Sequence, residues 1–187
     1  VGEVNGIKIP EADLDNSPTD LINYCNKYGV PKYIVIRTTA GVPTLLKCKE
    51  LGLREIVILA LLNVGAVAKH IHEKKPSCIC IVCSGWRGRN YAFEDHLAAG
   101  LLISRLIDLG ATDLKELSIE ALSALALYKG LRDLNIDLKT LIMSSSSAKD
   151  LNETKRKRDI DYCLKIDAYD LVPIMINREI IKSSDKS

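Results

Sequence analysis

The stretch from Cys78 to Gly100 restricts the fold of this chain more than any other. It begins as a continuous apolar run, passes through a loop that contains Gly85 and Gly88, and ends in an apolar helical pattern. The apolar run predicts a buried strand, and the glycines predict a turn between that strand and the helix. This order is typical of open α/β sheets, which bind ligands at the carboxyl ends of their strands.

Strand-then-helix alternation extends along most of the chain. Near-continuous runs of apolar residues predict three strands, which cover Tyr33–Arg37, Glu55–Leu61 and Ile79–Val82. Capping residues and helical apolar spacing predict the helices: from Pro18 to Gly29, from Pro43 to Gly52, Val64–His72, from Glu94 to Gly110, and Ile119–Lys129 with Gly130 as its stop. The predicted fold class is α/β, a layered α/β/α arrangement with a mostly parallel or mixed sheet.

The remaining segments complete this prediction. Leu171–Ile176 is predicted as a last strand, at a sheet edge because Pro173 lacks an N–H donor. The tail Lys182–Ser187 is expected to be disordered. We expect a single α/β domain over residues 1–187, or two halves consisting of strand–helix repeats (1–110) and a helix-rich part with an edge strand (111–187).

Composition excludes several classes of protein. The 187 residues are 47% hydrophobic and 27% charged, which favours a packed core over disorder. A net charge of +2 is too small to indicate nucleic-acid binding, and no apolar run is long enough for a membrane span. With no secretory leader visible, we expect a cytoplasmic protein whose six cysteines are reduced.

The chemistry-bearing residues of the Cys78–Gly100 stretch are two acids and two arginines. Glu94 and Asp95 begin the helix, and Arg87 and Arg89 lie in the loop before it. Acids in a first helical turn are also explained by the helix dipole alone. Next to a cationic loop, however, they suit a site that binds Mg²⁺ and an anion together. Glu3 is a further candidate metal ligand, with a lone exposed carboxylate as the alternative.

Polar residues follow all three predicted strands and would meet at one sheet edge. Hydroxyls and backbone N–H groups at such turns bind anions. The candidates are Thr38, Thr39 and Gly41 after the first strand, Asn63 after the second, and Ser84 and Gly85 after the third. Asn63 has an alternative role as a helix cap, and Ser17 is predicted to cap the helix at Pro18. His70 and His72 are expected at the surface.

In their order and spacing, these motifs resemble the 2-phosphosulfolactate phosphatase family, an enzyme group of coenzyme M formation. The resemblance covers most of the chain. Its motifs are Gly2-Glu3, Asn16-Ser17-Pro18, Thr38-Thr39 with Gly41, Asn63 with Ala66-Val67-Ala68, Val82-Cys83-Ser84-Gly85, Gly88-Arg89, Glu94-Asp95 with Ala98-Ala99-Gly100, Ser145-Ser146, and Asp161-Tyr162-Cys163 with Asp167. The resemblance implies a Mg²⁺-dependent phosphatase with an α/β fold and an acidic metal site.

The expected function is therefore hydrolysis of a small anionic phosphate monoester, with a phosphate or sulfonate compound as substrate. The expected catalytic residues are Asp95, Glu94, Arg87 and Arg89. The expected substrate-binding residues are Thr38, Thr39, Gly41, Asn63, Ser84, Gly85, Asn16 and Ser17. The expected Mg²⁺ ligands are Glu94, Asp95 and Glu3. A homo-oligomer is expected, with neither nucleic acid nor membrane as a partner.

An alternative is a non-catalytic protein on the same scaffold that binds anions or forms oligomers. The chain departs from the family pattern in three ways, of which the first and the second favour this alternative. The resemblance implies a further strand before Gly2-Glu3, which this sequence does not contain. The turn after the first strand reads Thr38-Thr39-Ala40-Gly41-Val42 and has two polar groups fewer than the family's, and Leu59–Leu62 replaces a Gly-Ser pair before Asn63. A phosphoryl transferase is a third reading, without a nucleotide loop to support it.

Overall fold

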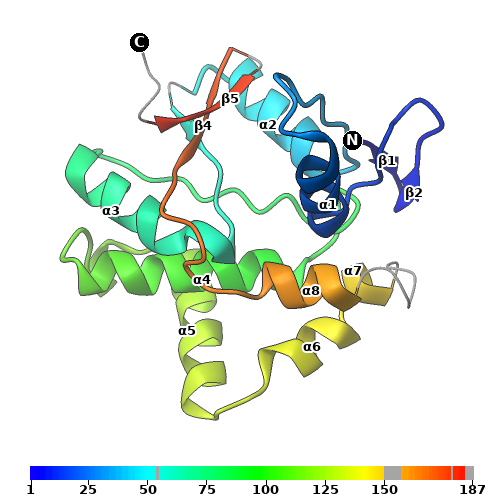
Figure 1. Cartoon of the computed structure of the whole chain (residues 1–187). Helices are drawn as coiled ribbons and strands as arrows, with labels where there is room; N and C mark the ends of the chain where they lie inside the picture. Colours follow the sequence, from blue (N-terminus) through cyan, green and yellow to red (C-terminus); the bar gives the residue numbers. More distant parts are fainter. Residues whose placement is uncertain (54, 150–156, 178, 184–187) are drawn as a thin grey trace.

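Three helices form the centre of the molecule in the computed structural model, which describes residues 1–53, 55–149, 157–177 and 179–183. Helix α4 (Phe93–Asp108) crosses the middle, with α3 (Val64–Lys74) on one side and α5 (Ile119–Asp133) on the other (Figure 1). Apolar residues of α3 and α4 dominate the main core cluster. The predicted helical spacing thus buries one stripe of each helix.

Helices α4 and α5 approach so closely that one position requires glycine. A Cβ added at Gly100 would lie 2.1 Å from the carbonyl oxygen of Ala124. No side chain fits in that space, because non-bonded heavy atoms pack at about 3.5–4.0 Å. The absence of a side chain at Gly100 therefore sets the distance between the two helices.

Local sequence signals predicted the helices well. Helix α1 (Pro18–Tyr28) begins after Ser17, whose hydroxyl accepts a hydrogen bond from the Asp20 N–H. Helix α2 (Gly41–Glu50) also forms near its predicted place. Helix α5 begins at the predicted Ser118 cap but runs past Gly130 to Asp133. A single glycine weakens a helix by only about 1 kcal/mol. Packing of α5 against its neighbours therefore keeps it helical beyond Gly130.

Shorter elements complete the chain. They are η1 (Leu61–Asn63), η2 (Leu114–Glu116), α6 (Leu138–Ser144), α7 (Ser146–Lys149) and α8 (Lys157–Cys163). Helix α8 holds the start of α1, because the buried Asp159 carboxylate accepts hydrogen bonds from Ser17 Oγ at 3.0 Å and from the Thr19 N–H at 3.2 Å. No helix in the described ranges is long and apolar enough to cross a bilayer.

The strands differ from the sequence-based prediction. The α/β class is confirmed, but the sheets in the described part of the chain are small and antiparallel: β1 (Glu3–Val4) pairs with β2 (Ile7–Lys8), and β3 (Ile56–Val57), β4 (Pro173–Ile176) and β5 (Glu179–Lys182) form a second sheet in that order. The layered sheet with parallel strands is not found there. Of the three predicted parallel strands, only part of Glu55–Leu61 is a strand, as β3.

The other two predicted strands do not form strands in the described part of the chain. Tyr33–Arg37 bonds instead to the N-terminal residues: Arg37 bridges Gly2 in parallel, the Val1 amino group donates to the Val35 carbonyl, and Arg37 exchanges backbone hydrogen bonds with Val1 and Glu3. Among the described residues, no backbone hydrogen bond joins Cys78–Cys83 to another segment. Strand propensity reflects packing against neighbours, so an apolar run alone does not establish pairing. The two segments were predicted to be buried, but much of each is exposed. Val35 is 81% exposed, and Cys78, Cys80 and Cys83 are also exposed.

The edge position predicted for Leu171–Ile176 is wrong, because β4 is the central strand of its sheet. Pro173 is its first residue, where a missing N–H is tolerated. Its carbonyl accepts from the Ile58 N–H at 2.9 Å. The disorder predicted for Lys182–Ser187 does not hold at Lys182, which ends β5; residues 184–187 lie outside the described part.

Asn63 does not cap α3 with its side chain. Its amide instead accepts from the Ala60 N–H and donates to the carbonyls of Ile58 and Leu171. The cap comes from far along the chain, because Asp167 Oδ1 accepts from the Gly65 N–H at 2.5 Å. A sequence pattern that considers neighbouring residues alone misses a cap supplied from such a distance.

Candidate active site

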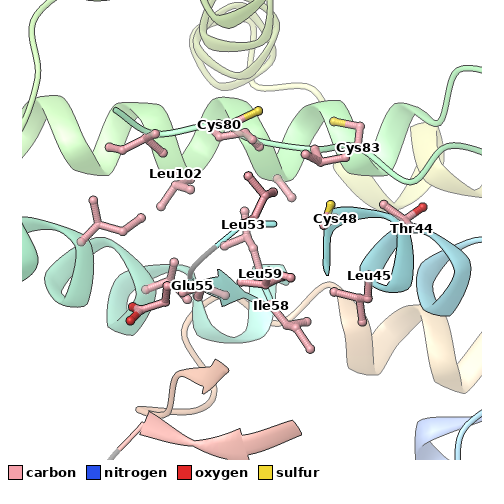
Figure 2. Close-up of a pocket in the computed structure, with 18 of the residues that line it drawn as sticks. Thr44, Leu45, Cys48, Leu53, Glu55, Ile58, Leu59, Cys80, Cys83 and Leu102 are labelled. Atoms are coloured by element: carbon pink, nitrogen blue, oxygen red, sulfur yellow. The ribbon is translucent and has the colours of Figure 1, made fainter. Parts of the chain in front are cut away.

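A cavity of about 510 Å³ lies between α2, α3, α4 and two extended segments, residues 55–59 and 78–84. Figure 2 shows its mostly apolar lining, with Leu45, Leu59 and Leu102 around the space. We call it the central cavity. Gly41, Ser84 and Asp95 also line it. The structure therefore brings together three of the predicted site residues, which come from three different parts of the chain.

Asp95 is fixed by the loop that precedes its helix. The Gly85 N–H donates to Asp95 Oδ2 at 2.8 Å, and the Ser84 N–H also bonds the carboxylate. Burial raises the pKa of Asp95, and the neighbouring Glu94 charge raises it further, although the two N–H groups oppose the shift. A half-buried carboxylate with a raised pKa lacks sufficient positive charge around it.

The Glu94 carboxylate also lacks a compensating partner. Its Oε2 is buried and has no hydrogen-bond partner, and it is the one such side-chain atom in the described part of the chain. Burying a carboxylate oxygen without a partner is costly. Orphaned buried atoms of this kind indicate a functional role or an ion that binds there.

The loop between the extended segment and α4 is a tight turn. The Trp86 N–H donates to the Asn90 carbonyl at 2.9 Å, and the Asn90 N–H donates back at 3.1 Å. Gly85 has a φ of 76°, which a residue with a side chain rarely adopts. The Arg87 guanidinium lies over the Trp86 ring, 4.7 Å from its centre. The turn thus presents Arg87 and Arg89 at an exposed tip.

The turn before α2 lies beside this loop. A Cβ at Gly88 would be 3.9 Å from the carbonyl oxygen of Thr39. Glu3 fixes this turn, because its carboxylate accepts hydrogen bonds from the Thr39 N–H at 2.7 Å and from Thr39 Oγ1 at 2.8 Å. It also accepts from the Gly6 N–H at 2.8 Å. The Glu3 oxygens thus make three hydrogen bonds within the protein.

Comparison with known proteins identifies the family. A sequence model described as 2-phosphosulpholactate phosphatase matches residues 1–178. The chain belongs to the 2-phosphosulfolactate phosphatase family. A relative from Cyanothece sp. is 32% identical over 177 residues, which are 93% of this chain and 68% of the relative. Relatives from Caldanaerobacter subterraneus and Clostridium botulinum are each 32% identical and span 98% and 97% of this chain, and 71% of their own lengths.

All three relatives carry the name probable 2-phosphosulfolactate phosphatase. A phosphatase of this name is a phosphoric monoester hydrolase, so the predicted enzyme class is confirmed at the level of the family. Because the match spans nearly all of the chain, it includes the Thr38–Gly41 turn, the Ser84–Asn90 loop and the start of α4.

Other predicted site residues of this family member lie elsewhere. Asn63 is buried and hydrogen-bonded within its own turn and to Leu171. Ser17 is buried at the junction of α1 and α8, and Asn16 is exposed beside it. Neither Asn63 nor Ser17 lines the central cavity. Ser17 caps α1, as its sequence position predicted, and it also bonds Asp159. The hydrogen bond of Asn63 to Leu171 was not predicted.

Three further titratable groups belong to the site region, and sequence reasoning missed them. Cys83 is exposed as a residue, but partial burial raises the pKa of its thiol, and the Asp95 charge adds to the shift. Burial, Cys83 and Glu94 together raise the pKa of the Tyr91 phenol. His70, predicted at the surface, is instead buried, and its Nε2 lies 2.8 Å from Glu55 Oε1. Its position three residues after buried Val67 is the signal that places it on the inner face of α3.

Proposed function

We propose that this protein is a Mg²⁺-dependent phosphatase that hydrolyses a small anionic phosphate monoester of the 2-phosphosulfolactate type. The observation that carries the proposal is the unpartnered, buried Oε2 of Glu94 beside Asp95. Membership in the family supports the reaction class. The proposal includes a cytoplasmic location and a role in coenzyme M formation, as the resemblance implies.

The residues at the start of α4 suit Mg²⁺. In the described ranges, no three side chains of His, Cys, Asp or Glu gather around one point. Mg²⁺ does not need such a cage, since one or two carboxylates, waters and substrate oxygens usually hold it. Glu94 and Asp95 would therefore be its ligands. Glu3 is the weaker candidate, because it would have to give up hydrogen bonds to Thr39 and Gly6.

Positive groups on the turns before α2 and α4 would bind the substrate. Helix α2 begins at Gly41, so its N-terminal end, which carries a partial positive charge, lies at the central cavity. Arg87 and Arg89 would pair with the phosphate and the second anionic group through forked hydrogen bonds. The Thr38 hydroxyl accepts from the Val42 N–H at 2.9 Å and so fixes the first turn of α2.

In the reaction, water attacks phosphorus, the ester P–O bond breaks, and the alcohol leaves with a proton. A bound Mg²⁺ would act as a Lewis acid that stabilises charge on the phosphoryl oxygens. The arginines would stabilise the same charge from the loop side. Glu94 and Asp95 would orient the water, and the N–H groups of Ser84 and Gly85 would keep Asp95 in place.

A non-catalytic protein that binds anions or oligomerises is the second candidate. The exposure of Tyr33–Arg37 and Cys78–Cys83 favours it, because an enzyme of this fold class would normally bury these segments. The Glu3 carboxylate also occupies the backbone donor of Thr39 that an anion would otherwise use.

Phosphate release separates the two candidates. The purified protein is given 2-phosphosulfolactate and simple phosphomonoesters, with Mg²⁺ and with a chelator. We expect release that requires Mg²⁺ and is fastest for the substrate with two anionic groups. If none of these compounds releases phosphate in a metal-dependent way, the phosphatase proposal is wrong and the non-catalytic candidate is favoured.

A further inference from the structure

The central cavity has a polar end and a mostly aliphatic interior. Gly41 at the start of α2, Ser84 and Asp95 line it at the end where the phosphate is proposed to bind. Most of the remaining lining consists of Leu, Ile, Val and Cys side chains. Figure 2 shows Leu53 and Leu59 in the space between α3 and α2. The part of the site beyond the phosphate is therefore apolar.

The cavity reaches into the protein core. Cys48, Val67 and Leu102 line it and are buried, so they form its floor. Its volume of about 510 Å³ lies in the range of pockets that enclose most of a small organic molecule. The space is thus deep enough to take a substituent of the substrate out of water.

The interior offers little to a second anionic group. His70 and Glu55 lie in the lining but pair with each other, with Nε2 and Oε1 2.8 Å apart. Lys74 is the only Lys or Arg in the described lining, and it is exposed. Arg87 and Arg89 lie outside the lining, on the exposed turn. Because an unpaired buried charge is costly, the interior favours an uncharged group.

The lining also distinguishes between kinds of apolar group. In the described part of the lining there is no Phe, Tyr or Trp. Proteins commonly bind nucleobases and other aromatic rings by stacking them on such side chains. Branched aliphatic side chains instead pack against aliphatic groups through non-directional contacts. The cavity therefore suits an aliphatic substituent better than an aromatic one.

We propose that the substrates include phosphate monoesters of aliphatic alcohols, whose hydrocarbon group enters the central cavity. The phosphate stays at the polar end with Asp95 and the start of α2, and a second anionic group, where a substrate has one, stays with the arginines of the turn. This inference rests on the proposed phosphatase function and widens its substrate class. Each methylene group that enters the cavity should tighten binding about fourfold.

Binding of methyl-, propyl- and hexylphosphonate, which the enzyme cannot hydrolyse, tests the inference by titration calorimetry with Mg²⁺ present. Leu53 lines the cavity and is 46% exposed, whereas Leu51 is 69% exposed and lies outside the lining, so both should accept tryptophan without unfolding. We expect wild type and Leu51→Trp to bind longer chains more tightly, and Leu53→Trp, which fills the space, to lose this gain. Equal affinities of the wild type for all three phosphonates, or the same chain dependence in both variants, would overturn the inference.

Phosphate release from methyl, propyl and hexyl phosphate separates a failure of this inference from a failure of the proposed function. Within this series, in which each ester carries a single anionic group, we expect kcat/KM to rise with chain length in the wild type and in Leu51→Trp. Release that does not depend on chain length would overturn the inference and keep the phosphatase. If no ester releases phosphate, the proposed function is wrong and the assignment of these esters as substrates falls with it.

Discussion

The Gly85 N–H donates a hydrogen bond to Asp95 Oδ2 at 2.8 Å and so joins the glycine loop to the first turn of α4. A Cβ at Gly85 would lie 2.6 Å from the Asn90 carbonyl oxygen, so no other residue fits this turn. Asp95 is held by the backbone, while its neighbour Glu94 has an oxygen without a partner. One acid is thus fixed in place and the other remains available to bind.

Replacing Asp95 with asparagine should separate activity from stability. We expect Asp95→Asn to lower kcat/KM by about 10²-fold or more, the cost of one stabilising group in a transition state. The folded protein should not suffer, because the variant removes a half-buried charge and its amide oxygen still accepts from Gly85. Asp108→Asn, an exposed acid in the last turn of the same helix, is the control and should keep full activity.

The same variant should change how stability depends on pH. Burial raises the pKa of Asp95 above its ordinary value of 3.8, so the folded protein binds this proton more tightly than the unfolded chain. The wild type should therefore lose stability as the pH rises from about 4 through the raised pKa. Thermal unfolding of Asp95→Asn over the same pH range should lack this loss; identical profiles would show that Asp95 is not strained by burial.

Cys83 should report on the Asp95 charge. Burial and Asp95 raise the pKa of the Cys83 thiol, so less of the reactive thiolate exists at a given pH. In Asp95→Asn, alkylation of Cys83 by iodoacetamide should become faster, and its pH profile should shift to lower pH. Peptide mass spectrometry measures the rate at this residue. An unchanged rate would mean that the two side chains do not interact.

Gly100 should tolerate no side chain. Gly100→Ala places a methyl group against the Ala124 carbonyl oxygen, and overpacking of this kind costs about 1–3 kcal/mol of unfolding free energy. Gly130→Ala is the matched control in α5, where a Cβ meets nothing within 4 Å. That variant should be stabilised by about 0.4–1 kcal/mol. Urea unfolding compares the two; equal effects would refute the close contact between α4 and α5.

Ser17 should act through stability. Its hydroxyl caps α1 and also donates to the buried Asp159. We expect Ser17→Ala to lower the free energy of unfolding by about 0.5–2 kcal/mol, as the loss of a helix cap does. The KM for the phosphate ester should not change, since Ser17 does not line the central cavity. A raised KM at unchanged stability would instead place Ser17 in the substrate site.

The sequence predicted the helices because their signals are local. Ser17, Ser118 and Gly110 mark helix ends through contacts within a few residues. The strand predictions failed because strand pairing depends on segments that are distant in the sequence. Among the described residues, Ile79–Val82 has a strand-like composition but no backbone partner. Glu179–Lys182, of which only Lys182 was predicted to be disordered, pairs with β4. Composition alone gives no information about such a partner.

The sequence also predicted part of how the candidate site residues lie relative to one another. Gly41, Ser84 and Asp95 share a cavity, as their places after strands and at a helix start suggested. Asn63 and Ser17 were also predicted to bind substrate, but neither lines the cavity, and both bond to residues far along the chain. Asn63 bonds the carbonyl of Leu171, and Ser17 bonds Asp159, both more than 100 residues away. A polar residue at a turn becomes structural or functional according to which distant group reaches it.

Cation binding at the start of α4 is the central claim, and Mn²⁺ as a paramagnetic substitute for Mg²⁺ tests it most directly. Electron paramagnetic resonance gives the bound fraction for the wild type, Glu94→Gln and the control Glu73→Gln, an exposed acid on α3. We predict one site that Mg²⁺ displaces, lost in Glu94→Gln and retained in Glu73→Gln. Equal Mn²⁺ binding by all three proteins, or none by the wild type, would contradict the account.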